Sequence, residues 1–427
     1  MGEKKSNAPG KTLPFKPVEK ESPKKVIVGV TGKMDSIMAV YLLKKQGYHC
    51  TAISVLLSDY LPDSDMPKDE SPIFGSCYIE DLDPVKEICD SMKIPFYGVD
   101  AQNEHRDQIT DLAIESRLDG QEFNPYPYCY RIIMDILLKK MEYFKADYIA
   151  TGHYAKISHN RTLRQSHLFE TDHREYDQTY HLGLLTPRHL EKLILPLSEI
   201  GHKKLKKMAK TTNIDFIKKP PKDDLVFTQG DKFPQFIEGR VAKTLLNKGN
   251  IYNYGNAMTL GDHSGVHHYY LGQNNLPIKE PHAIDPEYQV VNINRASGNV
   301  FVNINIKLKF IHCYLIKFNP NCNLNTSKPL RIFVKLSLNG KKIPASIFFK
   351  NNDTVLLEFE KKQSGLLPPG RFAVLYNKDE GGSKILGSGI VRSSGILEKN
   401  RFHHLPKLET DTDYEDEQED YMSGNII

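Results

Sequence analysis

The feature that most constrains the fold is a regular alternation of short apolar runs and helical segments between residues 24 and 150. The run Val26–Val30 is rich in β-branched residues, which is typical of a strand buried in a parallel sheet. In Ser36–Gln46 the apolar residues recur at helical spacing, and Gly47 then gives a stop signal. The alternation continues with strands expected at Cys50–Leu57, Phe96–Val99 and Asp147–Ala150, and with helices expected at Asp83–Met92, His105–Leu118 and Tyr130–Tyr143. This order predicts an α/β fold with a doubly wound parallel sheet, in which ligands bind at the carboxyl ends of the strands.

The second half of the chain has a different pattern. From Tyr252 onward, short segments of alternating polar and apolar residues are separated by Gly and Asn turns, which predicts an antiparallel β module. Its expected strands are Val300–Lys307, Leu330–Leu338, Ile343–Phe349, Thr354–Phe359, Phe372–Tyr376 and Ile385–Val391. We therefore expect a disordered leader at 1–23, a nucleotide-binding domain at 24–230, a small central domain at 231–290, a β domain at 291–398 and an acidic disordered tail at 399–427.

Composition excludes several classes of protein. Charged residues make up 26% of the chain and no apolar run reaches eighteen residues, so we expect a soluble protein without a membrane-spanning helix. The six cysteines form no C-x-x-C pair, so no structural metal site is expected, and their scarcity suits the reducing cytoplasm. The lysine cluster between Lys203 and Lys222 has two open interpretations, a solvated helix face or a surface for RNA phosphates.

The segment Thr31–Ser36 joins the first expected strand to the first expected helix, a geometry that binds phosphate through the free N–H groups of the helix N-terminus. Gly29 and Gly32 allow close approach of the backbone, Thr31 and Ser36 add hydroxyl donors, and a carboxylate at Asp35 suits magnesium. A Walker A loop is excluded, because Ile27 and Met34 stand where that motif needs glycine and Ser or Thr. An ordinary strand–turn–helix corner remains the alternative.

The loop resembles the S-G-G-x-D-S signature of the PP-loop ATP pyrophosphatases. Further motifs follow in order: Asn124-Pro125 with Cys129, Asp147–Tyr154 (DYIATGHY), Asp177–Tyr180 (DQTY), Tyr270–Gln273 (YLGQ) and Pro369-Gly370. From Lys25 to Gly395 the chain resembles one family of that class, the bacterial and mitochondrial tRNA-specific 2-thiouridylases of the MnmA type. The resemblance implies a PP-loop catalytic domain, a small central domain and a C-terminal antiparallel β-barrel.

It also implies an activity. The family uses ATP, which we expect to act with magnesium, to adenylate the C2 oxygen of the wobble uridine in tRNA, and a protein-bound persulfide then supplies sulfur to give 2-thiouridine. The partners implied are tRNA and a sulfur-donor or persulfide-relay protein in the cytoplasm, with no membrane.

Site residues carry over by position. The nucleotide site would comprise Gly29, Val30, Thr31, Gly32, Lys33, Met34, Asp35, Ser36, Val55 and Gly152, and the RNA contacts would be Asn124, Pro125, Asp177 and Gln178. Cys129 matches the first catalytic cysteine and is expected just ahead of the helix Tyr130–Tyr143, where a thiolate is stabilised. A small buried apolar role is the alternative for a lone cysteine.

The departures from the family pattern concern the chemistry. Lys33 stands at the second glycine of the loop, Tyr126 at an aspartate, and Val226 at the second cysteine; Ser337-Leu338 replaces an Arg-Tyr pair that meets the target base. Three hypotheses stay open. The chain is a tRNA sulfurtransferase with modified chemistry, a catalytically inactive tRNA- or nucleotide-binding relative, or a PP-loop adenylating enzyme with another acceptor.

Overall fold

A computed structural model describes most of the chain between residues 23 and 396. The described residues are 23–57, 82–160, 165–212, 214, 216, 233–274, 276, 288–304, 309–324, 327–351, 353–378 and 382–396. The leader, the acidic tail, Val226 and the last lysines of the cluster, Lys218, Lys219 and Lys222, lie outside these residues.

A five-stranded parallel sheet forms the centre of the first domain, as the alternation predicted. The strand order is β3-β2-β1-β4-β7, with β1 at Lys25–Gly29, β2 at His49–Leu56, β3 at Phe96–Asp100, β4 at Tyr148–Ala150 and β7 at Leu193–Ile194. Strand β1 pairs in parallel with both β2 and β4, so the chain first builds outward to one edge and then returns to the other side of β1. The reversal opens a crevice at the carboxyl ends of β1 and β4.

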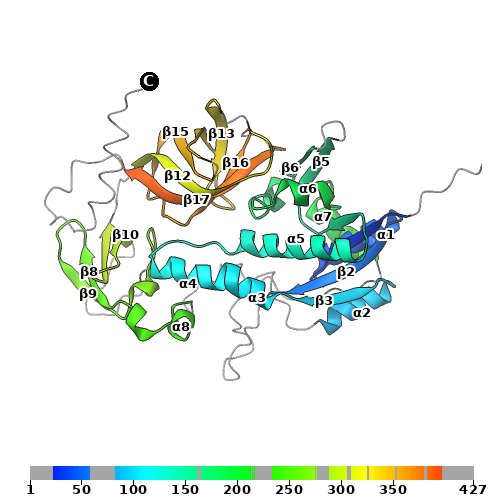
Figure 1. The fold of residues 1–427 in the computed structure, drawn as a ribbon, viewed down its shortest axis with the longest axis horizontal. Helices are drawn as coiled ribbons and strands as arrows, with labels where there is room; N and C mark the ends of the chain where they lie inside the picture. The colour runs from blue at the N-terminus through cyan, green and yellow to red at the C-terminus, as the bar shows by residue number, and fades with distance from the viewer. Residues whose placement is uncertain are drawn as a thin grey trace, which may run out of the picture.

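Helices cover both faces of this sheet because neighbouring side chains of a strand point to opposite sides. Val26 and Val28 pack with residues of α1 (Met34–Lys45) and α2 (Asp83–Ser91). Ile27 belongs to a second core cluster, which also contains residues of α4 (Asp111–Leu118) and α5 (Tyr126–Tyr143), and Figure 1 shows α5 beside the sheet. The single helix expected at His105–Leu118 is divided into α3 (Gln102–His105), a π-helical turn at Arg106–Thr110, and α4.

The remaining elements of the first domain are the hairpin β5 (Lys156–Asn160) and β6 (Gln165–Phe169) and the helices α6 (Pro187–Lys192) and α7 (His202–Thr211). Helix α7 packs on α1 through Leu205 and Ala209. Its lysines are all exposed on the opposite side, at Lys203, Lys204, Lys206, Lys207 and Lys210. Within the described residues, no helix combines the length and the apolar character that crossing a membrane requires.

A four-stranded sheet and helix α8 (Phe233–Glu238) form the central module. The sheet order is β10-β11-β8-β9, with β8 at Gly249–Asn253, β9 at Thr259–His263, β10 at Tyr288–Asn294 and β11 at Asn299–Ile304. The boundary expected at residue 290 therefore falls inside β10, and β11 pairs with β8 rather than with the C-terminal strands. Polar–apolar alternation identifies a strand, but it does not say which sheet the strand joins.

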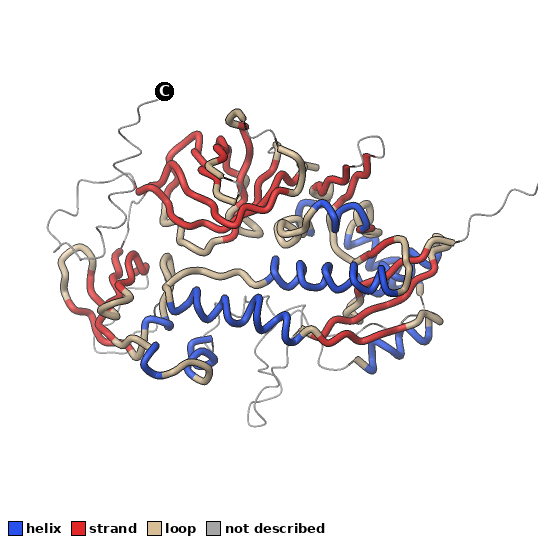
Figure 2. The backbone as a smooth tube through the Cα atoms, in the orientation of Figure 1, coloured by secondary structure: helices blue, strands red, loops and turns tan. Residues whose placement is uncertain are grey.

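The C-terminal strands close into an antiparallel barrel in the order β12-β15-β14-β13-β16-β17, which confirms the predicted fold class. Figure 2 shows this barrel above the loop that leads into α5. The strands are β12 (Lys309–Pro320), β13 (Leu330–Lys335), β14 (Ile343–Phe349), β15 (Val355–Ser364), β16 (Phe372–Tyr376) and β17 (Ile385–Ile396). Phe372, Val374 and Tyr376 of β16 belong to the hydrophobic core of the first domain, so the barrel is packed onto that domain.

A buried ion pair also links the two domains. Lys342, at the entry to β14, places its Nζ 2.6 Å from Glu170 Oε2 and 2.6 Å from Ser383 Oγ. The two charged side chains are each only 7% exposed. Each of these buried charges offsets the desolvation cost of the other, so removing one leaves the other buried without a counter-charge.

We expect Lys342→Met to lower the free energy of unfolding by about 3–5 kcal/mol, because it leaves the Glu170 carboxylate buried without its cation. Urea unfolding followed by circular dichroism measures this loss. The matched control is Arg331→Met, which breaks the exposed Arg331–Glu360 pair on the barrel surface and should leave the midpoint nearly unchanged. Equal effects of the two substitutions would contradict the structural role of Lys342.

Candidate functional site

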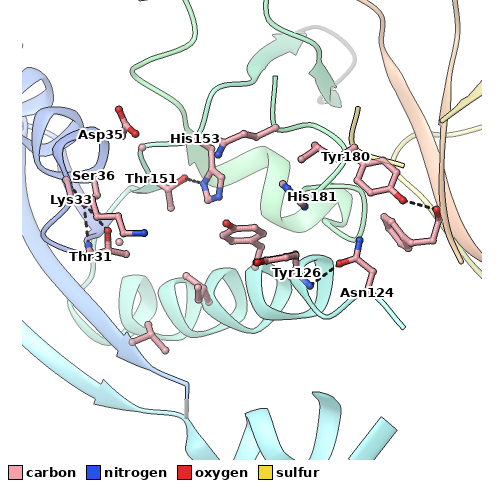
Figure 3. Close-up of a pocket in the computed structure, with 18 of the residues that line it drawn as sticks. Thr31, Lys33, Asp35, Ser36, Asn124, Tyr126, Thr151, His153, Tyr180 and His181 are labelled. Carbon is pink, nitrogen blue, oxygen red and sulfur yellow. Dashed lines mark hydrogen bonds between the residues drawn. The ribbon is translucent and has the colours of Figure 1, made fainter. Parts of the chain in front are cut away.

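One cavity of about 760 Å³ joins the first domain to the barrel. Its walls come from the loop after β1, the carboxyl end of β4, the start of α5, the turn after Asp177, and the barrel residues Leu336–Asn339 and Arg371-Phe372. Figure 3 shows side chains from these elements facing a common space. The cavity therefore occupies the crevice that the strand order opens between β1 and β4.

The phosphate loop is stabilised by its own hydroxyl groups. Ser36 Oγ accepts a hydrogen bond from the Thr31 backbone N–H at 3.1 Å and donates one to the Lys33 carbonyl at 3.0 Å. Gly32 has a φ of 73°, in the left-handed region that favours glycine. Helix α1 begins at Met34, with no side-chain cap at its N-terminus, so backbone N–H groups of its first turn remain available for an anion.

Lys33 fits this loop without strain. Its φ of -71° and ψ of 155° are ordinary for a residue with a side chain, so the loop does not need glycine at this position. The side chain is exposed and extends into the cavity in Figure 3. A lysine there adds a positive charge where phosphate groups would lie.

Gly152, two residues after the end of β4, allows this part of the chain to lie against the phosphate loop. A Cβ at this position would lie 2.7 Å from the carbonyl carbon and oxygen of Asp35 and 2.8 Å from the Ser36 nitrogen. Two residues later, the Tyr154 hydroxyl donates to Asp35 Oδ1 at 2.7 Å. The segment that follows β4 is therefore in close backbone contact with the first turn of α1, and Tyr154 in that segment orients the Asp35 carboxylate.

Aromatic and imidazole side chains form the middle of the cavity. Tyr126 and His181 have ring centroids 5.3 Å apart, and Tyr130 meets the edge of His153 at 4.5 Å. Burial lowers the pKa of His153 to about 3 and that of His181 to about 4, so both rings are neutral at pH 7. The His181 Nδ1 has no hydrogen-bond partner among the described residues.

The far wall belongs to the barrel. Leu336–Asn339 follow β13, and Arg371 precedes β16 with its Nε 2.7 Å from Glu122 Oε2. The Tyr180 hydroxyl donates to the Phe372 carbonyl at 2.7 Å, which joins the turn of the first domain to the barrel edge. A nucleotide at the phosphate loop would thus occupy the same cavity as any group that contacts Ser337 and Leu338 of the barrel.

Comparisons with known proteins agree with this architecture. Residues 24–230 match the family model described as tRNA methyl transferase HUP domain, and residues 311–391 match the one described as aminomethyltransferase beta-barrel domain. The tRNA-specific 2-thiouridylase MnmA of Clostridioides difficile is 27% identical over 376 residues, covering 87% of this chain and 99% of that protein. The MnmA of Clostridium perfringens is 29% identical with the same coverage, and that of Mycoplasmopsis synoviae is 27% identical over 88% of this chain and 97% of its own length.

The chain belongs to the MnmA-type tRNA-specific 2-thiouridylase family. The resemblance carried by the short motifs is thereby confirmed. The roles of individual residues depend on where the structure places them.

The cavity gathers most of the residues expected for this thiouridylase-type site. Those among its lining are Gly29, Val30, Thr31, Lys33, Asp35, Ser36, Val55, Asn124, Gly152 and Gln178. Gly32, Met34, Pro125, Cys129 and Asp177 are not among the described residues that line it. Gly32 and Met34 contribute to the shape of the loop through their backbone. Their roles in nucleotide binding stay predictions.

Cys129 lies inside a helix, so the expectation that it precedes the helix is wrong. Helix α5 begins at Tyr126, and the Cys129 N–H donates to the Pro125 carbonyl at 3.0 Å. The apolar spacing of Tyr130–Tyr143 missed this first turn, although proline is well tolerated at the start of a helix. The side chain is 4% exposed, and a catalytic role of Cys129 stays a prediction.

Asp177 and Gln178 are used by the protein itself. The Asp177 carboxylate accepts hydrogen bonds from the backbone N–H groups of Thr171 at 2.9 Å and Thr179 at 3.1 Å, and burial raises its pKa. Gln178 Oε1 accepts from the Tyr154 N–H at 2.9 Å. These contacts order the turn beside the cavity, and contact of the two residues with RNA stays a prediction.

Sequence reasoning missed several lining residues, above all Thr151, His153, Tyr180 and His181. Thr151 and His153 follow β4 directly, so the rule that ligands bind at strand ends was a usable signal for them. The Arg371–Glu122 pair carried no such signal, because its members are 249 positions apart.

We expect Gly152→Ala to weaken ATP binding at least about tenfold, because the added methyl group must displace the backbone of Asp35 and Ser36. Isothermal titration calorimetry with a non-hydrolysable ATP analogue measures the affinity. The matched control is Gly239→Ala, whose Cβ would meet its nearest atom at an ordinary 3.7 Å. Unchanged affinity in folded Gly152→Ala would contradict the assignment of the nucleotide site.

A second prediction concerns pH. Burial lowers the pKa of His181 to about 4 in the folded chain, against about 6.5 for a free imidazole, so the unfolded chain binds the proton more tightly. The contribution of the neutral His181 side chain to the stability of the folded state is present above pH 6.5. It is lost as the pH falls from about 6.5 to 4. We expect the free energy of unfolding of His181→Phe, relative to that of the wild type, to be roughly 1–3 kcal/mol higher at pH 4.5 than at pH 7. Urea unfolding at the two pH values measures this difference. Parallel pH profiles for the two proteins would rule this out.

Proposed function

We propose that this protein is an ATP-dependent sulfurtransferase that replaces the C2 oxygen of the wobble uridine of tRNA with sulfur. The observation that carries the proposal is the single cavity with the phosphate loop at one end and the barrel edge Leu336–Asn339 at the other. The relatives that match over almost their whole length are named for tRNA 2-thiolation.

In this proposal the ATP phosphates lie on the N-terminus of α1. Thr31 and Ser36 line the cavity there together with Lys33, and Ile53 and Val55 offer apolar contact from β2. The Asp35 carboxylate, oriented by Tyr154, suits a magnesium ion that also binds phosphate oxygens, since magnesium commonly takes one or two carboxylates. We assign these residues the tasks of binding and orienting the α-phosphorus toward the cavity.

The uridine would enter from the barrel side. Its C2 oxygen attacks the α-phosphorus, pyrophosphate leaves, and a sulfur nucleophile then displaces AMP from C2. The rings of Tyr126 and His181 are tilted by 56° to each other, and either ring offers an aromatic face of the kind on which bases stack. The exposed lysines of α7 offer contacts for tRNA phosphates, which would make the affinity depend on salt.

The source of the sulfur nucleophile is a separate question. Cys129 is 4% exposed in the first turn of α5, which favours hydrosulfide over a persulfide on Cys129. In this proposal a sulfur-donor protein delivers the hydrosulfide, or a thiol releases it from the persulfide of a relay protein and forms a disulfide with that protein. The cytoplasmic location of such a donor belongs to the same proposal. The burial of Cys129 also supports a second candidate, a relative that binds ATP and tRNA without turnover.

We expect purified protein, ATP, tRNA and sulfide to yield 2-thiouridine together with AMP, measured by nucleoside mass spectrometry and nucleotide chromatography. Gly152→Ala should abolish both products, and Gly239→Ala should retain both. Cys129→Ser should retain sulfide-dependent thiolation, because in this proposal the sulfur does not pass through this thiol.

Other outcomes separate the hypotheses. Salt-sensitive tRNA binding without AMP or 2-thiouridine would identify the non-catalytic relative. AMP release that requires an acceptor other than tRNA would identify an adenylating enzyme with a different substrate. Loss of thiolation in folded Cys129→Ser would show that the cysteine carries sulfur.

A further inference from the structure

A cluster of metal-ligand side chains lies in the central module, built from different residues than the cavity. Glu238 is the last residue of α8, and His267 and His268 lie in the single 3-10 turn Val266–His268. One ligand atom from each residue lies within 4.8 Å of the others. Their convergence brings together segments about thirty positions apart, so it results from the fold rather than from local spacing.

Both imidazole rings point at the same carboxylate oxygen. His267 Nε2 lies 3.0 Å from Glu238 Oε1, and His268 Nε2 lies 3.2 Å from that atom. The ring centroids of the two histidines are 4.4 Å apart. Ser264 Oγ is a further polar atom at this point, 2.9 Å from His268 Nε2.

These separations suit a small tetrahedral ion. Zinc binds histidine nitrogen and carboxylate oxygen at about 2.0–2.2 Å, which places neighbouring ligand atoms roughly 3.3 Å apart. The observed nitrogen–oxygen separations differ from that value by only a few tenths of an ångström. Small side-chain shifts would therefore convert the hydrogen-bonded arrangement into coordination.

The protonation states also suit metal binding. Burial lowers the pKa of both His267 and His268, which favours the neutral imidazole that coordinates metals. The hydrogen bond from His267 lowers the pKa of Glu238, so this group is a carboxylate at neutral pH. Arg117, the nearby cation, lies over the rings of Tyr270 and Phe233 at 4.7 Å and 5.2 Å.

Exposure differs across the cluster. The His267 side chain is fully buried, whereas that of His268 is 21% exposed and that of Glu238 is 40% exposed. The surrounding protein holds the buried His267 in place. The exposed His268 and Glu238 leave an ion an entry route and room for a water ligand. Three protein ligands with one open position is a frequent arrangement for zinc.

We propose that Glu238, His267 and His268 form a binding site for a divalent transition-metal ion, with zinc as the expected occupant. Imidazole with carboxylate suits zinc better than magnesium or calcium, which prefer oxygen ligands. His267 Nδ1 has no hydrogen-bond partner among the described residues, so the support that usually strengthens a histidine ligand is missing and the affinity is expected to be moderate. The bound ion would tie the end of α8 to the turn that precedes Tyr269.

The expectation from cysteine spacing addressed a different kind of site. The absence of C-x-x-C pairs led to the expectation of no metal site, whereas the ligands of this cluster are two histidines and a glutamate. Histidines adjacent in sequence with a distant glutamate give no recognisable spacing, so only the fold brings these ligands together.

The test uses the full-length, untagged protein after removal of metals with a chelator. Zinc titration by calorimetry should show one saturable site, and cobalt should give the intense visible absorption of a four-coordinate ion. His268→Ala and Glu238→Gln should each weaken zinc binding at least about tenfold. The control is His173→Ala, an exposed histidine outside the cluster, which should bind zinc like wild type.

Glu238→Gln keeps the size and hydrogen-bonding capacity of the side chain, so this variant is expected to remain folded, and circular dichroism checks that it does. Absence of a saturable site in the wild type would overturn the proposal. So would equal zinc affinity in His268→Ala, Glu238→Gln and His173→Ala. Thiolation activity plays no part in these measurements, so failure of the proposed function would leave the metal site standing.

Discussion

The reciprocal contact between Tyr154 and Gln178 is the interaction on which the shape of the site depends. The Tyr154 N–H donates to Gln178 Oε1 and the Gln178 N–H donates to the Tyr154 carbonyl, both at 2.9 Å. Tyr154 also reaches Asp35 in the phosphate loop, and one residue past Gln178 the Thr179 hydroxyl meets the Tyr376 hydroxyl of the barrel at 3.2 Å. Hydrogen bonds, together with the backbone between them, therefore link the barrel to the phosphate loop.

The departures from the family pattern converge in space. Lys33, Tyr126 and Ser337-Leu338 are far apart in sequence, yet all of them line the same cavity. The glycine that the backbone approach requires, Gly152, is retained. The family pattern is therefore kept at the close backbone approach beside the loop, and the departures lie where the proposed function places the phosphates, the base and the sulfur. The route of the sulfur is the most informative test of that proposal.

Much of the fold could be predicted because its signals are local. The strands Ile343–Phe349 and Phe372–Tyr376 have the predicted bounds, and the order of strands and helices before residue 150 gave the parallel sheet. Two errors have identifiable causes. β11 was assigned to the wrong module because alternation carries no information on strand partners, and the first turn of α5 was missed because Pro125 and Pro127 interrupt the apolar spacing.

For the site, the sequence by itself determined the phosphate loop, since Thr31, Gly32 and Ser36 act within a few residues of one another and local spacing controls their geometry. Only the tertiary structure decided which other groups share the chamber. Docking of the barrel brings Ser337 and Arg371 to the cavity that the loop also lines, and helix packing buries Cys129. These outcomes depend on contacts between residues hundreds of positions apart, such as Arg371 with Glu122, which no periodicity or motif encodes.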